Sequence, residues 1–170
     1  VLFRCELDAL PIHEISDSQW RSEVDGKGHL CGHDGHMTMM LGFGRMLSRK
    51  PVARGRVVLM FQPAEEDGSG ARAVVADPAF AQIAPDWAFA IHNEPGRPFG
   101  YVSTRVGLIN CASQGLLIRL TGKTAHAADP QDGVSPASAL AKLIPALNAL
   151  GQGGALDNDF KLVTITHVNV

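Results

Sequence analysis

The sequence predicts an α/β fold, in which a mostly parallel sheet is covered by helices and is followed by the first half of an α+β domain. Three apolar runs, at residues 1–7, 56–61 and 87–91, lack the polar alternation of a half-exposed strand. Segments of helical character separate them, at residues 35–49 and 70–76. This βαβαβ order is typical of parallel sheets whose ligand sites lie beyond the carboxyl ends of the strands.

Local sequence features set the limits of these elements. The first strand is expected to end at Asp8-Ala9-Leu10-Pro11, because proline cannot continue a central ladder. A polar loop runs to Gly28, and the following helix ends near Lys50-Pro51. The third strand is bounded by Asn93-Glu94-Pro95-Gly96. Apolar side chains cover most of the first helix, which predicts a core position for Met37, Met40, Leu41, Phe43, Gly44 and Leu47.

The character of the chain changes around residues 105–113. We predict a strand at 114–120, an alanine- and leucine-rich helix at 135–150 and an alternating strand at 161–168. Ser135 and Pro136 suit the N-cap and the first position of that helix. These elements amount to half of an α+β sandwich. We therefore place a first domain at residues 1–108 and a second, cut short at Val170, at residues 109–170.

Composition narrows the class of partner. The 170 residues are 45% hydrophobic and 19% charged, as in ordinary globular proteins, and the formal net charge is −2. Without a basic field, nucleic acid and anionic membranes are excluded as expected partners, which leaves a small molecule. The cysteines show no disulfide-like spacing, and no apolar run approaches the ~20 residues of a membrane span. These features predict a cytoplasmic protein.

Residues 29–36 have the composition of a metal site. They read His29-Leu30-Cys31-Gly32-His33-Asp34-Gly35-His36, with glycines between the polar side chains. Thiolate and imidazole bind zinc and similar divalent ions well, and glycine permits the tight turns that bring neighbouring ligands together. A Cys-x-His pair cannot complete a four-ligand site. Further ligands must therefore come from other strand ends.

The two other strand ends carry suitable residues. Glu65 and Glu66 follow the second strand, and His92 follows the third. If the backbone is extended at the two glutamates, their side chains point to opposite sides, so one can bind a cation while the other acts as a base. Taken alone, the glutamates also fit a solvated acidic turn, and a single histidine fits a structural role. Metal-competent residues at three successive strand ends favour one shared metal site.

Four segments occur in order along the chain: residues 4–11 (Arg-Cys-Glu-Leu-Asp-Ala-Leu-Pro), 29–36, 61–66 (Phe-Gln-Pro-Ala-Glu-Glu) and 122–128 (Gly-Lys-Thr-Ala-His-Ala-Ala). Together they resemble the M20 metallopeptidase family, in particular its amidohydrolase branch. That branch contains hippurate hydrolases, N-acyl-amino-acid amidohydrolases and indoleacetyl-amino-acid hydrolases. The resemblance implies a ferredoxin-like lid and dimerisation domain inserted after the catalytic domain, and a homodimer or tetramer formed through it.

The resemblance also implies two co-catalytic divalent ions, zinc or manganese, with cobalt or nickel also compatible with such donors. By position, the ligands would be Cys31, His33, Glu66 and His92, with Cys31 as a bridging thiolate. Glu65 would be the general base. A water activated by the ions would attack the amide carbon of an N-acyl or aryl-acyl amino acid, and Glu65 would return the proton to the leaving amine.

His126 lies in a small-residue turn whose local sequence fits a surface histidine. In the family, the matching histidine of the lid reaches the active site, often that of the neighbouring subunit, and binds the substrate carboxylate or the developing oxyanion. A donor aimed at developing charge can lower the barrier by ~3 kcal/mol. The resemblance therefore implies a catalytic role for His126.

Further residues have weaker assignments. Asp8 matches a family aspartate that orients the metal site without binding the ions. Glu6 stands where the branch usually has aspartate, and its role stays open. His36 is expected at the helix start or in support of the metal site. The remaining candidates are His29, without a secure role, His13 and His167 as structural or surface residues, Cys5 and Cys111 as small packing residues, and Asn110 as a hinge or lid contact.

Two alternatives remain beside the amidohydrolase. One is a dipeptidase or aminoacylase of the same family, which differs only in substrate. The other is a non-catalytic protein that keeps the lid for dimerisation and the metal site as a remnant; a remnant has no need of a base such as Glu65 beside a ligand. Family members carry one more histidine ligand after the lid. We therefore expect the 170 residues to be a segment of a longer protein that, alone, binds metal weakly and folds poorly.

Overall fold

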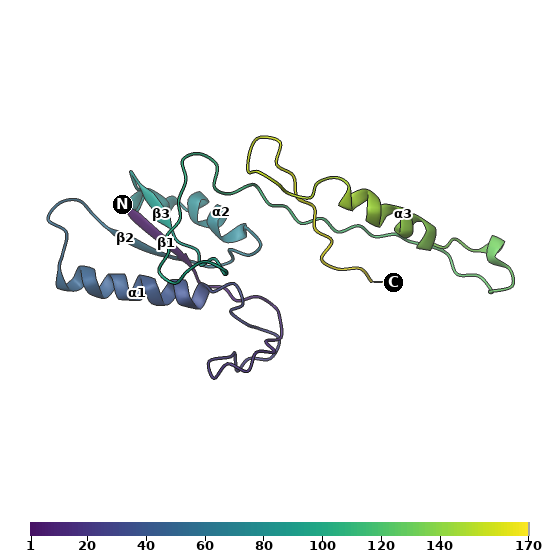
Figure 1. Ribbon diagram of the computed structural model, residues 1–170, viewed down its shortest axis with the longest axis horizontal. Coiled ribbons are helices and arrows are strands. Elements are labelled where there is room, and N and C mark those ends of the chain that lie inside the picture. The colour runs from purple at the N-terminus through teal and green to yellow at the C-terminus, as the bar shows by residue number, and fades with distance from the viewer. Residues whose placement is uncertain (170) are drawn as a thin grey trace. The chain divides into compact units, whose positions relative to one another are not determined.

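The computed structural model describes residues 1–169, which divide into two compact units, one at residues 1–98 and one that begins at Phe99 (Figure 1). The division falls after residue 98, earlier in the sequence than the predicted domain boundary after residue 108. The domain boundary itself stays a prediction.

A parallel sheet forms the centre of the first unit. Its strands are β1 (Leu2–Glu6), β2 (Val58–Gln62) and β3 (Ala88–Ala90), in the order β2-β1-β3. Both neighbours run parallel to β1, with Leu2 opposite Val58 on one side and Ala88 on the other. The predicted parallel α/β sheet is therefore confirmed, with each strand a residue or two shorter than its apolar run.

Helices connect the strands. The helix α1 (His33–Arg49) joins β1 to β2, while α2 (Ser69–Ala76) and a 3₁₀ turn, η1 (Pro78–Gln82), which was not predicted, join β2 to β3. Figure 1 shows α1 and α2 on opposite sides of the strands. Right-handed crossovers require this arrangement, because the chain first steps to one side of β1 and then returns across it. The carboxyl ends of β1 and β3 border the point where this order reverses, which is where doubly wound sheets place their ligands.

Aromatic packing fixes α1 against the sheet. The ring of Phe3 meets Phe43 of α1 edge-to-face, with centroids 4.8 Å apart, and stacks on Phe89 of β3 at 5.4 Å. Met40 of α1 is also buried. Leu41, which was predicted to be a core residue, is instead 61% exposed and borders an open groove between α1 and β2. The buried stripe of α1 is narrower than its apolar sequence because α1 contacts the sheet with one face only.

The second unit contains one α-helix, α3 (Ala137–Asn148), and a 3₁₀ turn, η2 (Pro130–Asp132), among its described residues. The predicted helix at 135–150 is confirmed with shorter ends. Ser135 Oγ accepts the backbone N–H of Ala137 at 3.3 Å, but the N-cap position is taken by Pro136, one residue later than predicted.

The strands predicted at 114–120 and 161–168 are wrong for the part of the chain that the structure describes. Outside the three-stranded sheet, the described residues pair as strands do only in isolated bridges. In the second unit these bridges join Lys123 to Val134 and Gln152 to Leu162. An apolar run becomes a strand only when a neighbour pairs with its backbone, and Leu116 and Leu117 remain 80% and 84% exposed. The ferredoxin-like lid therefore stays a prediction.

Close packing of the turn after β2 can be tested by comparing Gly70, which contacts this turn, with Gly42, which does not. A Cβ added to Gly70 would lie 1.7 Å from the carbonyl oxygen of Pro63, whereas one added to Gly42 in α1 would meet open space. We expect Gly70→Ala to lower the free energy of unfolding by about 1–3 kcal/mol, because the turn must open to admit the methyl group. Gly42→Ala should raise it by about 1 kcal/mol. Urea unfolding of both variants measures this, and a Gly70→Ala variant as stable as the parent contradicts the close approach.

Candidate metal centre

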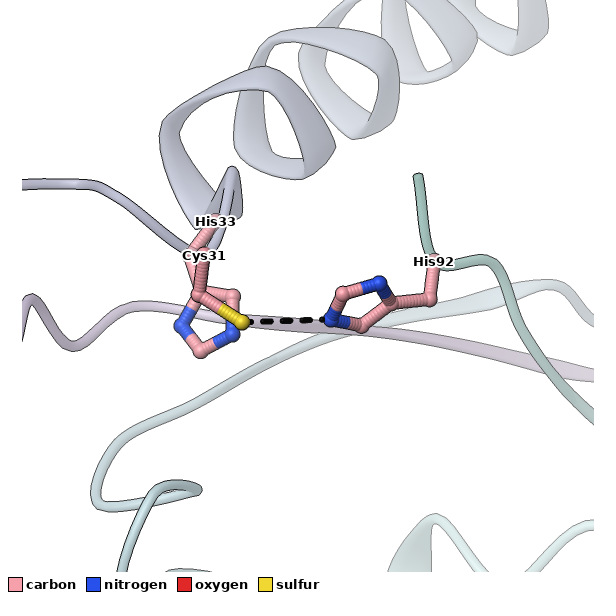
Figure 2. A group of neighbouring side chains, drawn as sticks. All are labelled: Cys31, His33 and His92. Carbon is pink, nitrogen blue, oxygen red and sulfur yellow. Dashed lines mark hydrogen bonds between the residues drawn. The ribbon is translucent and has the colours of Figure 1, made fainter. Parts of the chain in front are cut away.

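Three chain segments bring metal-competent side chains together at the carboxyl ends of the strands. Cys31 and His33 stand at the start of α1, Glu65 and Glu66 follow β2, and His92 follows β3. Two groups of possible ligand atoms result, Cys31/His33/His92 and His33/Glu65/Glu66, each with its atoms within 4.8 Å of one another. Figure 2 shows the first group, in which the Cys31 sulfur points at the His92 ring.

His33 connects the two groups. Its side chain is fully buried, and Nδ1–H donates to the backbone carbonyl of Asp8 at 2.9 Å, which leaves the Nε2 lone pair free. That Nε2 atom has no hydrogen-bond partner, and carboxylate oxygens of Glu65 and Glu66 lie 3.8 and 3.7 Å away. Buried nitrogens are rarely left unpaired. A cation between these atoms would satisfy the nitrogen and neutralise both carboxylates.

His92 is oriented in the same way. Its Nδ1–H donates to the backbone carbonyl of Asn93 at 2.7 Å, and its Nε2 lies 3.4 Å from Cys31 Sγ. Metal-binding histidines usually have one ring nitrogen held by a carbonyl or carboxylate so that the other points at the metal. Both histidines of the centre therefore present Nε2.

The thiol of Cys31 is in surroundings that disfavour its charged form. Burial, then a hydrogen bond to Glu66 and the charges of Glu66, Glu65 and Glu6, raise the pKa of Cys31 to about 11. A bound divalent cation reverses this balance, because it supplies the opposite charge and takes the thiolate as a ligand. One sulfur, two imidazole nitrogens and two carboxylates are a donor set that suits zinc, manganese, cobalt or nickel.

The two glutamates leave β2 through a turn, not as extended chain. Ala64 has a left-handed φ of 50°. Asp8 Oδ2 accepts the backbone N–H groups of Glu65 at 2.8 Å and Glu66 at 3.1 Å. Both carboxylates consequently approach the same nitrogen of His33, whereas an extended backbone would send them to opposite sides. Asp8 thus holds both the glutamate turn and, through its carbonyl, His33.

Glycine is required at the turn between Cys31 and His33. Gly32 has a backbone φ of 90°, which residues other than glycine rarely adopt, and it directly precedes α1. An added Cβ would lie 2.5 Å from Asn93 Oδ1. The turn that carries two candidate ligands is therefore in direct contact with the loop that carries His92.

A buried group beside the centre was only partly expected from the sequence. His36 Nδ1–H donates to Glu6 Oε2 at 2.7 Å, and its Nε2 accepts the backbone N–H of Asn93 at 3.0 Å. Burial raises the pKa of Glu6, but the hydrogen bonds from His36 and its own backbone, with the Arg4 charge, outweigh burial and hold it below its usual range. Sequence reasoning placed His36 near the site but missed Asn93, because no spacing relates residues 57 positions apart.

His126 lies in the second unit. Its side chain is 80% exposed, its Nδ1 accepts the backbone N–H of Ala128 at 3.2 Å, and its carbonyl accepts that of Asp129 at 2.9 Å. These contacts are those of a surface turn, and the catalytic role of His126 stays a prediction.

The weaker candidates divide between loop, core and surface. His13 pairs with Asp25 at 2.5 Å in an exposed loop, as expected of a surface histidine. Cys5 is buried as predicted, but Cys111 is exposed, so its expected packing role is wrong. The apolar residues around Cys111 lack a described partner segment that would bury it. The buried Nδ1 of His29 has no partner, whereas Asn110 and His167 are exposed.

Comparison with known proteins identifies the family. The family model described as peptidase family M20/M25/M40 matches residues 2–168. The chain belongs to the M20 peptidase family. It is 37% identical to an IAA-amino acid hydrolase of Arabidopsis thaliana over 99% of this chain and 38% of that protein. It is 34% identical to an N-acetyldiaminopimelate deacetylase of Anoxybacillus flavithermus (96% and 43%) and 31% identical to an N-acetylcysteine deacetylase of Bacillus subtilis (99% and 44%).

One solved structure agrees with this M20 assignment. A dinuclear metal-binding peptidase of the M20 family from Bacillus subtilis is 39% identical, with a TM-score of 0.54 over 59% of this chain and 28% of that one. An aminohydrolase structure from Staphylococcus aureus, 24% identical with a TM-score of 0.57 over 88% of this chain and 40% of that one, supports the fold alone. The chain spans less than half the length of these relatives. Among residues 1–169, no helix combines the length and hydropathy needed to cross a bilayer.

The raised pKa of Cys31 predicts how its thiol reacts. In metal-free protein, Cys31 should react slowly with iodoacetamide near neutral pH, because the thiolate becomes abundant only as the pH approaches about 11. The exposed Cys111 is the internal reference. Mass spectrometry of alkylated peptides across a pH series measures both rates. Alkylation of Cys31 ahead of Cys111 at neutral pH contradicts the described surroundings of the thiol.

Proposed function

We propose that the whole protein is a metal-dependent amidohydrolase that releases amino acids from N-acyl or aryl-acyl conjugates. The observation that carries the proposal is the unpartnered, fully buried Nε2 of His33, which faces Glu65 and Glu66 beside the Cys31–His92 pair. Membership of the M20 family supports the same reaction class.

We propose that Cys31, His33, Glu66 and His92 would hold two divalent ions. The support is the proximity of these donors and the dinuclear metal site of the Bacillus subtilis relative. When bound, the ions polarise the amide carbonyl and make a water molecule more acidic.

Glu65 is the proposed general base. Its backbone N–H is held by the Asp8 carboxylate, and one of its own carboxylate oxygens lies 3.9 Å from Arg4 Nη2. These two contacts hold the Glu65 side chain at the centre. It would accept a proton from the attacking water and deliver it to the amine nitrogen as the C–N bond breaks. His126, from the lid of a second subunit, would donate a hydrogen bond to the developing oxyanion or to the substrate carboxylate.

The proposed substrate class follows from what the relatives have in common. They are described as acting on IAA-amino acids, N-acetyldiaminopimelate and N-acetylcysteine, all of which join an acyl group to an amino acid through an amide. We extend this class to the present protein, with its acyl group unassigned, and propose a cytoplasmic homodimer.

The assay uses the full-length natural protein loaded with zinc, manganese, cobalt or nickel. Release of free amine is followed from N-acetyl, benzoyl and indole-3-acetyl amino acids, and from dipeptides. We expect hydrolysis of the acylated amino acids. Hydrolysis of dipeptides alone assigns the dipeptidase alternative, and no turnover with stoichiometric metal bound assigns the non-catalytic one.

The adjacent glutamates separate base from ligand. Glu65→Gln should retain the parent's metal content but lose about 10²–10⁴-fold in kcat, because the amide cannot accept the proton. Glu66→Gln should lower the metal content as well, since a carboxylate ligand is removed. Glu23→Gln, in an exposed loop, is the matched control and should change neither. Metal analysis and steady-state kinetics measure both quantities, and unchanged turnover in Glu65→Gln would refute the mechanism.

A further inference from the structure

A chain of buried polar contacts runs from the sheet to the loop after β3. We propose that His36 and Asn93 position His92, and thereby set the half of the metal centre formed by Cys31 and His92. The inference rests on the proposed function in so far as His92 is a metal ligand. His36 touches neither substrate nor ion in this proposal, so it is a positioning residue.

His36 has no free atom for a metal ion, although Glu6, His33 and His36 lie close enough together to suggest one. Its Nδ1 is bonded to Glu6 Oε2, and its Nε2 is bonded to the backbone of Asn93. The other oxygen of Glu6 pairs with Arg4. Two of the three members are thus fully engaged, and the group is a connection between elements, not a further ion site.

The connection begins in a rigid part of the molecule. His36 lies in the first turn of α1 and is 3% exposed, and Glu6 at the end of β1 is 1% exposed. Arg4, which pairs with Glu6, also donates through Nε to Gln62 Oε1 of β2 at 2.9 Å. Buried, mutually bonded groups of this kind hold one arrangement, because each broken bond leaves a polar atom unsatisfied. His36 therefore has a fixed place relative to β1 and β2.

The connection ends at His92. His36 Nε2 accepts the backbone N–H of Asn93 at 3.0 Å and lies 2.9 Å from its side-chain Oδ1. The carbonyl of the same Asn93 accepts Nδ1–H of His92 at 2.7 Å, and the rings of His36 and His92 pack with centroids 4.7 Å apart and planes at 66°. His36 thus fixes both the residue that orients His92 and the ring itself.

Other support for this loop is sparse. His92 and Asn93 are exposed, and β3 is a three-residue edge strand. In the described part of the chain, the side-chain hydrogen bonds that involve His92 or Asn93 go to each other, to His36 or to Cys31. Asn93 also contacts Gly32, between Cys31 and His33. Loss of the contact between His36 and Asn93 should therefore free His92 from its place opposite Cys31.

Two substitutions of His36 separate its two bonds. In His36→Asn, the side-chain amide reaches the position of Nδ1, so the bond to Glu6 is kept and the bond to Asn93 is lost. In His36→Gln, the amide reaches the position of Nε2, so the bond to Asn93 is kept. If positioning is the role, His36→Asn should weaken binding of one of two metal ions by about 10–100-fold, and His36→Gln should stay within a few-fold of the parent.

The probe is cobalt(II), titrated into the metal-free, full-length natural protein. The visible spectrum reports cobalt bound by thiolate and imidazole, and equilibrium dialysis gives the affinity for each ion. Asn93→Pro removes the backbone N–H that His36 Nε2 accepts and keeps the carbonyl that holds His92, so it should weaken binding in the same way as His36→Asn. Asn93 is exposed, so this variant serves if His36→Asn does not fold. His13→Asn makes the same substitution at an exposed histidine and should bind cobalt like the parent. Thermal unfolding of each variant checks that the fold is intact.

The outcomes distinguish this inference from the proposed function. If the parent binds two cobalt ions and the variants differ as expected, the inference holds even when no acylated amino acid is hydrolysed. Equal weakening by His36→Asn and His36→Gln overturns it, because the role would then be general support of the fold. Parent-like cobalt binding by folded His36→Asn or by folded Asn93→Pro overturns it as well, even in an active enzyme.

Discussion

Parallel pairing of β2 and β3 on the two sides of β1 is the constraint on which the centre depends. It places the ends of three strands at one edge, so that Glu66 and His92, from distant parts of the sequence, both lie close to His33. The sheet sets the distances between the strand ends, and the loops that follow the strands carry the candidate metal ligands.

Fine positioning within this frame depends on backbone carbonyls and one carboxylate. Carbonyls of Asp8 and Asn93 each hold Nδ1 of a histidine, and the Asp8 carboxylate holds the glutamate turn. These contacts leave the atoms that could bind a metal, such as His33 Nε2, without a strong hydrogen-bond partner. Such an arrangement is costly without a cation, because carboxylates face one another and the Cys31 thiol resists ionisation.

The network through Glu6, His36 and Asn93 gives the exposed end of β3 the rigidity that its three residues cannot supply. Its ionised member, Glu6, is stabilised by Arg4 and His36 in spite of burial. A buried charge of this kind is tolerated only where it is paired and fully hydrogen-bonded. The hydrogen-bonded residues Glu6, His36 and Asn93 are therefore connected to the candidate ligand His92.

The sequence by itself determined the strands of the first unit, the helix α1 and the residue types at the strand ends. These follow from local apolar runs, glycines and prolines that act over a few residues. Predictions that needed a partner segment were wrong: residues 114–120 and 161–168 form no strand, and Leu41 and Cys111 are exposed.

Only the tertiary structure decided that both glutamates face one histidine and that Asn93 links His36 to His92. Such contacts join residues that are near in space but far apart in sequence. They depend on the register of the sheet and on the conformation of each turn, such as the left-handed Ala64. A local pattern of residue types carries neither quantity, and for this reason the geometry of the centre emerged only from the folded chain.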